Sequence, residues 1–316
     1  MTYRTLGRTR LEISELGFGA SPLGDVFGKT DPREGMRAVH YAIDAGINFF
    51  DVSPYYGITL AETRLGEALE GRRDKVVLST KCGRYGADDF DFSPKRIRAS
   101  IDDSLGRLRT DYVDLLLAHD IEFGEERRII EETVPALRQI QRDGKARFIG
   151  ISGLPLKMLR RVAEAGNVDA ILSYCRYNLL MNDLDSTLAP FAHEQGIGLI
   201  NASPLHMGIL TDAGPPAWHP APPEVREAGA RVADLCRAAG VSVETVALRY
   251  CSRYPLAATT LVGMRQSSEV EANLRALDGQ TDPALLDRIE KIVAPVRNRL
   301  WPTGRLENRD DAVEPR

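Results

Sequence analysis

Four polar side chains that could exchange a proton with a substrate stand at or just beyond the ends of strand-like runs. Asp51, Lys81 and His119 each close such a run, and Tyr56 follows Asp51 by five residues. An ammonium at the end of a buried strand is unfavourable unless a partner there requires its charge. The placement of Lys81 therefore suggests a site rather than a surface.

The four residue types suit proton transfer coupled to hydride transfer. A tyrosine hydroxyl titrates near pH 10, and a nearby ammonium stabilises its phenolate form and lowers its pKa. A carboxylate would hold that ammonium in place, and a histidine would orient a substrate oxygen. Taken singly, Asp51 is equally a strand-end cap, Tyr56 a loop aromatic and His119 a core histidine. We expect function only from the four together.

Eight short apolar runs alternate with helical stretches, as expected of parallel strands covered by helices. The expected strands are Glu15–Gly19, Ile47–Asp51, Val76–Lys81, Tyr112–His119, Arg147–Ser152, Asp169–Ser173, Gly198–Ala202 and Thr259–Val262. This pattern predicts a closed (β/α)₈ barrel, in which the carboxyl ends of all strands meet on one face. The rival, a doubly wound open sheet, would carry a G-x-G-x-x-G turn that the chain lacks.

Local signals place the helices and the ends of the domain. Asp31-Pro32 and Ser93-Pro94 are expected helix starts, and Met36, Val39 and Ile43 are the expected buried face of the first helix. The last helix is expected to open at Thr281-Asp-Pro283 and run through Ala294. Residues 3–13 read as a β-hairpin before the first strand. We expect one domain over 1–316, with a long loop at 211–223 and a tail at 295–316 over the active face.

Composition excludes several classes of function. The 316 residues carry a net charge of −4, so no electrostatic case exists for nucleic acid or an anionic membrane. No run approaches the roughly 20 apolar residues of a spanning helix, and we expect a cytoplasmic protein. Cys82, Cys175, Cys236 and Cys251 lack metal-binding spacing, so reduced thiols and no metal site are expected. Asp120 and Glu122, directly after His119, are interpreted as solvated loop charges rather than as a glycosidase-like acid pair.

The residues around the four side chains resemble the aldo-keto reductases. The resemblance rests on the segments Asp51-Val-Ser-Pro-Tyr-Tyr-Gly57, Ser79-Thr-Lys-Cys82 and Leu117-Ala-His-Asp120, and it runs over nearly the whole chain. It implies an aldo-keto reductase type barrel with an N-terminal hairpin and assigns Asp51, Tyr56, Lys81 and His119 as a catalytic tetrad.

Within that family the chain is most similar to the L-galactose dehydrogenases and the related L-fucose or aldose 1-dehydrogenases, through segments such as Ser79–Tyr85 and Ala118–Gly124. This implies NAD(P)-dependent oxidation of the anomeric carbon of a free aldose to an aldonolactone. Two alternatives remain open: a general NADPH-dependent aldehyde reductase, and a non-catalytic regulatory barrel. The particular aldose and the oligomeric state are also left open.

The same resemblance implies contacts for the cofactor and the sugar. The expected cofactor contacts are Ser152, Tyr174, Ser203, Leu205, Gly208, Gly263, Met264, Arg265, Glu269 and Asn273. Tyr174 stands where many members have glutamine, and Ala202 where many have a ring-stacking tyrosine. A carboxylate at 269 would repel a 2′-phosphate, so NAD is favoured and NADP remains possible. His119, Trp218 and Trp301 are the expected contacts of the aldose.

Overall fold

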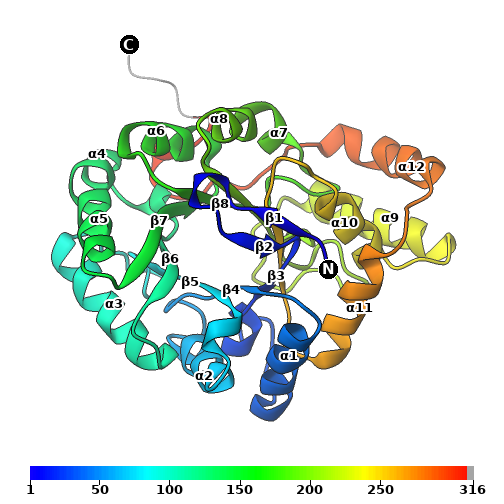
Figure 1. The fold of residues 1–316 in the computed structure, drawn as a ribbon. Coiled ribbons are helices and arrows are strands. Elements are labelled where there is room, and N and C mark those ends of the chain that lie inside the picture. Colours follow the sequence, from blue (N-terminus) through cyan, green and yellow to red (C-terminus); the bar gives the residue numbers. More distant parts are fainter. Residues whose placement is uncertain (312–316) are drawn as a thin grey trace.

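Eight parallel strands close into a barrel in the computed structural model, which describes residues 1–311 (Figure 1). In order around the barrel, the strands are β10 (Thr259–Gly263), β3 (Leu16–Gly19), β4 (Phe49–Asp51), β5 (Val77–Cys82), β6 (Val113–Ala118), β7 (Ala146–Gly153), β8 (Ala170–Tyr174) and β9 (Gly198–Ala202). The predicted (β/α)₈ barrel is therefore confirmed.

The strand boundaries lie close to those expected, and the largest difference occurs at β4. Ile47 was expected in the strand, but its backbone N–H donates to Ala42 O across 2.9 Å and so closes the preceding helix. The side chain of Asn48 is bonded to Ser14 N and Glu12 O. The two residues before β4 therefore serve the turn and the hairpin, and the strand begins at Phe49.

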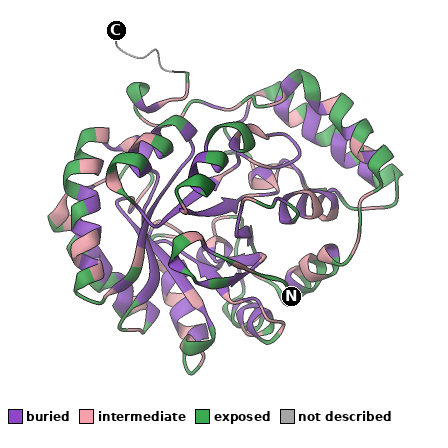
Figure 2. Ribbon diagram, turned by 45° about the horizontal axis from the view of Figure 1, so that its top comes forward, coloured by how far each residue is buried: buried purple, intermediate pink, exposed green. Residues whose placement is uncertain are grey.

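Helices cover the outside of the barrel. They are α1 (Pro32–Asp44), α2 (Leu60–Leu69), α3 (Pro94–Leu108), α4 (Glu126–Arg128), α5 (Val134–Arg142), α6 (Leu156–Gly166), α7 (Asp183–Thr187), α8 (Ala189–Glu194), α9 (Pro223–Ala238), α10 (Val243–Ser252), α11 (Ser267–Leu277) and α12 (Pro283–Val293). Asp31 and Ser93 cap α1 and α3 as predicted. Figure 2 shows buried strands inside and exposed outer helix faces.

One expectation for α1 was wrong. Met36 is 37% exposed, whereas Gly35 and Ala38 are buried. A Cβ on Gly35 would lie 2.9 Å from the Leu23 side chain, so the helix approaches its neighbour closely along its small residues. That close approach turns Met36 toward solvent.

The N-terminal hairpin closes one end of the barrel. β1 (Tyr3–Thr5) and β2 (Glu12–Ser14) pair antiparallel and lie across the middle of the ring of strands in Figure 1. Leu6 and Ile13 are fully buried and pack in one cluster with inward-facing residues such as Leu115. The hairpin and the barrel interior therefore share a core, which seals the end opposite the carboxyl ends of the strands.

The described part of the tail lies against the loops at the other end. Arg305 N donates to Glu122 O across 2.9 Å, and Asn308 Nδ2 donates to the carbonyls of Glu122 and Gly124, each across 2.8 Å. Asp310 accepts from Leu156 N and Lys157 N. Residues 312–316 of the predicted tail lie outside the described residues, and the assignment of 1–316 to one domain stays a prediction.

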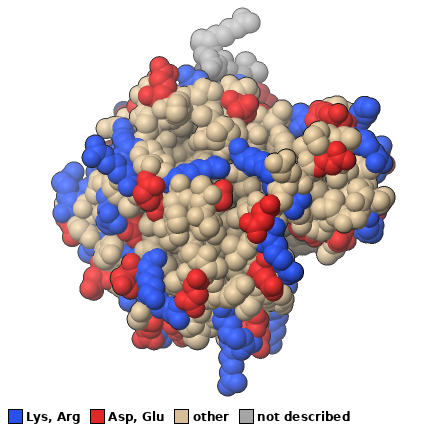
Figure 3. All heavy atoms as spheres, turned by 45° about the vertical axis from the view of Figure 1, so that its right-hand side comes forward, with Lys and Arg blue, Asp and Glu red and all other residues tan. Residues whose placement is uncertain are grey.

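The surface and the thiols match ordinary globular chemistry. On the face in Figure 3, acidic and basic side chains are interspersed. The four cysteines are buried and unpaired. Within residues 1–311, no helix is long and apolar enough to cross a membrane.

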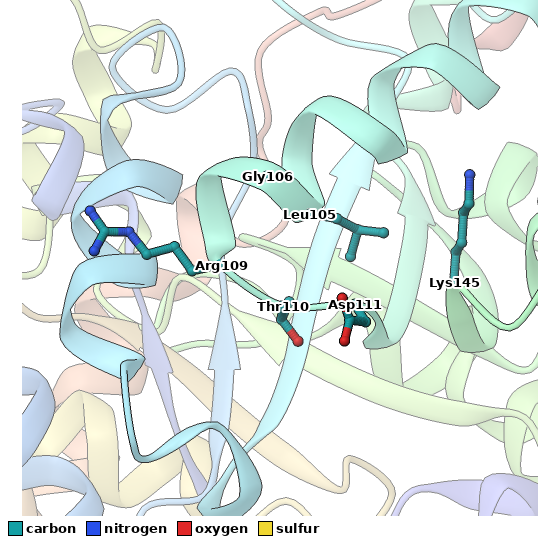
Figure 4. A pocket seen from close by; sticks show the side chains of 6 residues that line it. All are labelled: Leu105, Gly106, Arg109, Thr110, Asp111 and Lys145. Carbon is teal, nitrogen blue, oxygen red and sulfur yellow. The ribbon is translucent and has the colours of Figure 1, made fainter.

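A surface hollow of about 440 Å³ is lined by Leu105, Gly106, Arg109, Thr110, Asp111 and Lys145 (Figure 4). These residues precede β6 and β7, so the hollow lies at the amino ends of the strands. None of the four candidate catalytic side chains lines it.

Candidate active site

A buried ion pair forms the base of the site. Lys81, in β5, donates from Nζ to Asp51 at the end of β4, and also to Val52 O across 2.9 Å. Asp51 accepts a second bond from Ser79 Oγ across 2.8 Å. Lys81 and Asp51 are only 1% and 2% exposed, so the two charges depend on each other. Although burial opposes the ammonium, Asp51 raises the pKa of Lys81, which keeps its proton.

Tyr56 lies beside this pair. Lys81 Nζ is 4.9 Å from the centroid of the Tyr56 ring, and that ring meets His119 edge-on at 5.6 Å between centroids. Burial raises the pKa of Tyr56 to about 12, and the Lys81 charge opposes that rise. Lys81 thus lowers the pKa of the tyrosine as expected, but desolvation outweighs the ammonium and leaves the net pKa above its ordinary value.

His119 is held as a neutral donor. Burial lowers its pKa to about 3, so the imidazole carries no charge at neutral pH. Its Nδ1 lies 2.9 Å from Ser53 Oγ, which also accepts the Tyr55 N–H. Because the Ser53 hydroxyl has no other acceptor among the described residues, its proton goes to Nδ1. We assign the remaining ring proton to Nε2. Ser53, which sequence reasoning missed, thus fixes the tautomer.

Asp120 and Glu122 were wrongly interpreted as solvated. They are 3% and 0% exposed. Asp120 has a left-handed backbone, with φ of 50°, which folds the short 3₁₀ turn at Ile121–Phe123 back against the barrel. Burial raises the pKa of Glu122 to about 8, and Asp120 adds to that rise. The apolar residues Ile121, between the two acids, and Phe123, directly after them, were the signal that the turn is buried.

An arginine and three aromatic rings form a wall beside Asp120. Arg84 donates from Nη1 to Asp120 Oδ2, and its guanidinium lies 3.7 Å from the centroid of the Tyr55 ring. Phe90 and Phe123 stack on each other at 4.1 Å and lie near the same guanidinium.

The expected nicotinamide contacts lie at adjoining strand ends. Ser152, near the end of β7, has its Oγ 3.4 Å from both Asp120 N and Ala118 O. Tyr174 ends β8 directly beside Ala202 of β9, and its hydroxyl donates to Glu122 Oε1 across 3.4 Å.

The loop after β9 fits a pyrophosphate. Ser203, Met207 and Gly208 all have positive φ, a backbone conformation found in loops that bind anions. The Leu205 N–H makes no hydrogen bond to any residue within 1–311. A free donor in such a loop suits an anionic group, so these residues fit the cofactor implied by the resemblance.

The expected adenosine contacts surround the N-terminus of α11. Gly263 ends β10 and Met264 follows it, and Glu269 and Asn273 are one helical turn apart on α11. Glu269 Oε2 accepts from Arg265 N across 2.7 Å and from Gln266 N across 3.2 Å. It therefore caps the helix from within the site.

Arg265 points toward the loop after β3. Its Nη1 donates to Phe27 O across 3.1 Å and to Gly28 O across 2.9 Å. A second carboxylate, Glu34 of α1, accepts the Ser267 N–H across 2.9 Å. Sequence analysis missed Glu34, since its partner lies 233 residues away.

The two tryptophans differ in their surroundings. Trp218 is 52% exposed and lies 5.8 Å from Phe27 between ring centroids, so it bridges the loops after β9 and β3. Trp301 is 8% exposed and meets His206 and His219 edge-on. Much of the Trp301 ring is thus committed to packing, and its contact with a sugar stays a prediction.

Comparison with known proteins identifies the family. Residues 15–294 match the Aldo/keto reductase family. L-galactose dehydrogenase of Arabidopsis thaliana is 46% identical over 96% of this chain and 98% of that protein. D-threo-aldose 1-dehydrogenase of a Pseudomonas species is 30% identical over 83% of this chain and 89% of that protein.

A solved structure shows the same architecture. The aldo-keto reductase AKR11C1 from Bacillus halodurans, in its holo form, superposes with a TM-score of 0.76 at 26% identity, covering 96% of this chain and 98% of that one. The chain belongs to the aldo/keto reductase family, whose members use nicotinamide cofactors.

Proposed function

We propose that the chain is an NAD-dependent aldose 1-dehydrogenase that oxidises the anomeric carbon of an aldose of the L-galactose or L-fucose type to the aldonolactone. One observation carries the proposal: the buried pair of Asp51 and Lys81 lies beside Tyr56, whose ring meets a neutral His119. The relative named L-galactose dehydrogenase supports the choice of substrate.

Each of the four residues has one role in the proposal. Tyr56 accepts the proton of the anomeric hydroxyl, and Lys81 stabilises the phenolate that this requires. Asp51 holds Lys81, and the Nε2–H of His119 donates to the substrate oxygen and orients it. The oxidised nicotinamide, when bound, accepts the hydride that leaves C1.

The residues that would hold the cofactor favour NAD. The backbone N–H of Leu205 would donate to the pyrophosphate, and Ser203 and Gly208 would shape the loop around it. At the adenosine end, a 2′-phosphate would meet two carboxylates, Glu34 and Glu269, which already accept backbone N–H groups at the start of α11. The hydroxyls of an unphosphorylated ribose can instead donate to carboxylates.

Loops at the carboxyl ends of the strands are proposed to enclose the sugar. The loop 211–223 carries Trp218, and the tail from 295 onward contacts the turn after β6. The proposal includes a single domain over 1–316 and a cytoplasmic enzyme whose partner is a small aldose.

Initial rates with NAD and NADP across L-galactose, L-fucose, D-arabinose and simple aldehydes test the proposal. We expect the aldoses to be oxidised with NAD. Broad aldehyde reduction with NADPH would favour a general reductase, and absence of turnover across the panel would favour a regulatory barrel.

A further inference from the structure

Asp120 presents an unused carboxylate oxygen beside the proposed reaction centre. Its Oδ2 accepts from Arg84 Nη1 and lies 3.6 Å from His119 Nε2. Its Oδ1 accepts no hydrogen bond from any residue within 1–311, and it is not enclosed by protein. The residue is only 3% exposed, so this oxygen has little access to bulk solvent.

The Arg84 guanidinium also has hydrogen-bonding capacity that the described residues do not use. Its Nε donates to Gly86 O across 3.4 Å and its Nη1 to Asp120, but Nη2 donates to none of the described residues. The side chain is 17% exposed and lies against the Tyr55 ring. Burying an ion pair costs desolvation free energy, and hydrogen bonds that are left unmade do not offset that cost. The pair is therefore better explained as a ligand-binding group than as a contribution to stability.

The position of the pair identifies the part of the sugar within reach. The reacting oxygen on C1 must lie between Tyr56 and the Nε2–H of His119, and the C2 hydroxyl lies one carbon–carbon bond away. Asp120 lies 3.6 Å from that same Nε2, which puts its carboxylate within reach of this second hydroxyl. The Arg84 guanidinium, bonded to Asp120, places a second polar group beside this carboxylate.

We propose that Asp120 and Arg84 recognise the C2 and C3 hydroxyls of the aldose and make the enzyme selective for their configuration. Asp120 Oδ1 accepts from the C2 hydroxyl, and Arg84 Nη2 donates to the oxygen on C3. The inference rests on the proposed function. L-galactose, L-fucose and D-arabinose have the same configuration at both carbons and differ beyond C4, so one recognition site accepts all three.

Three pentoses isolate the C2 hydroxyl. D-ribose is the C2 epimer of D-arabinose, and 2-deoxy-D-ribose is D-arabinose without that hydroxyl. We expect the wild type to favour D-arabinose over both by on the order of 10²-fold or more in kcat/KM, because a buried polar group left unpaired rejects the analogue. Equal rates on D-arabinose and D-ribose would contradict the inference.

Asp120→Asn tests the carboxylate at nearly constant volume. We expect kcat/KM for D-arabinose to fall at least tenfold, chiefly through KM, while the rate on 2-deoxy-D-ribose changes little. If Asp120 had a merely structural role, its substitution would lower kcat/KM for both sugars by the same factor. Affinity for NAD, measured by fluorescence titration, should stay within about threefold of wild type.

Asp114→Asn is the matched control. Asp114 is also buried, lies in β6, and pairs with Arg73 and Arg147, but toward the amino end of the strand. It should leave the preference among the pentoses unchanged. If Asp120→Asn fails to fold, Arg84→Gln carries the test, because it should weaken the discrimination between D-arabinose and D-lyxose, its C3 epimer. The proposal fails if a folded variant retains wild-type discrimination. The proposed function itself fails only if the wild type oxidises none of these sugars.

Discussion

Glu34 of α1 accepts a hydrogen bond from the backbone N–H of Ser267, the first residue of α11, across 2.9 Å. That contact and the Arg37 side chain lower the pKa of Glu34 to about 2. A helix N-terminus ordinarily attracts anions, but here Glu34 and Glu269 already satisfy its donors. A phosphate would have to displace or repel them.

We therefore expect NAD to exceed NADP in kcat/KM, and Glu269→Lys combined with Glu34→Gln to narrow the gap by at least tenfold. Both changes remove negative charge from the end of α11, and the lysine adds a cation. Glu271→Lys is the control, since Glu271 lies on the same helix and pairs with Arg275. It should leave kcat/KM unchanged with both cofactors. A wild-type preference for NADP that Arg265→Ala removes would reverse the assignment.

Tyr56→Phe should lower kcat by on the order of 10² to 10⁴-fold, because only the hydroxyl can take the proton. Cofactor binding, followed by fluorescence titration, should be unchanged. Tyr55→Phe is the neighbouring control, since it keeps the ring beneath Arg84. Near-normal turnover by Tyr56→Phe would exclude it as the base.

The rate of oxidation should rise with pH through the neutral and alkaline range. Tyr56 acts as a base and its pKa is about 12, so the phenolate fraction grows tenfold per pH unit below that value. His119, with a pKa of about 3, should add no step near pH 6.5. Lys81→Met removes the ammonium that opposes the shift, so any residual rate should require still higher pH. An unchanged profile would show that Lys81 does not tune the tyrosine.

Stability should fall as pH rises from about 4.5 to about 8. Burial raises the pKa of Glu122 to about 8, above the value near 4.5 expected in the unfolded chain, so the folded state binds the proton more tightly over this interval. Glu122→Gln should flatten the dependence and be more stable than wild type at pH 9 by on the order of a few kcal/mol. Urea unfolding at pH 5 and 9 measures this. The exposed Glu125→Gln should keep the wild-type slope.

Removing the chain from Arg299 onward should raise KM for the sugar more than KM for NAD. The deletion removes the bonds from Arg305 and Asn308 to the turn that carries Asp120 and Glu122. Asn308→Ala, a milder change, should act in the same direction. Full selectivity among sugars after truncation would place specificity wholly in the barrel-rim loops.

The residues that sequence could identify are those fixed by a single strand. Lys81 and His119 are readable because a polar residue ending an apolar run can only face the carboxyl end of a parallel barrel. The barrel itself was predictable from the alternation of runs, and the hairpin from its turn.

Residues whose roles depend on contacts with distant parts of the chain could not be predicted from the sequence. Glu34 meets Ser267 only because barrel closure brings α1 beside α11. Ser53 acquires its role from a histidine 66 residues away. The net pKa of Tyr56 depends on how strongly the fold desolvates its hydroxyl, which the spacing of charges does not disclose.

Asn308 donates to backbone carbonyls 184 and 186 residues upstream, and Arg305 adds a third bond to the same turn. The rim of the site is thus assembled from the middle and the end of the chain. During synthesis the barrel strands leave the ribosome well before these last residues do. A nascent chain with all eight barrel strands would still lack the hydrogen bonds from Arg305 and Asn308 that hold the turn proposed to bind the sugar. Selectivity among sugars should therefore be reached only when translation is nearly finished.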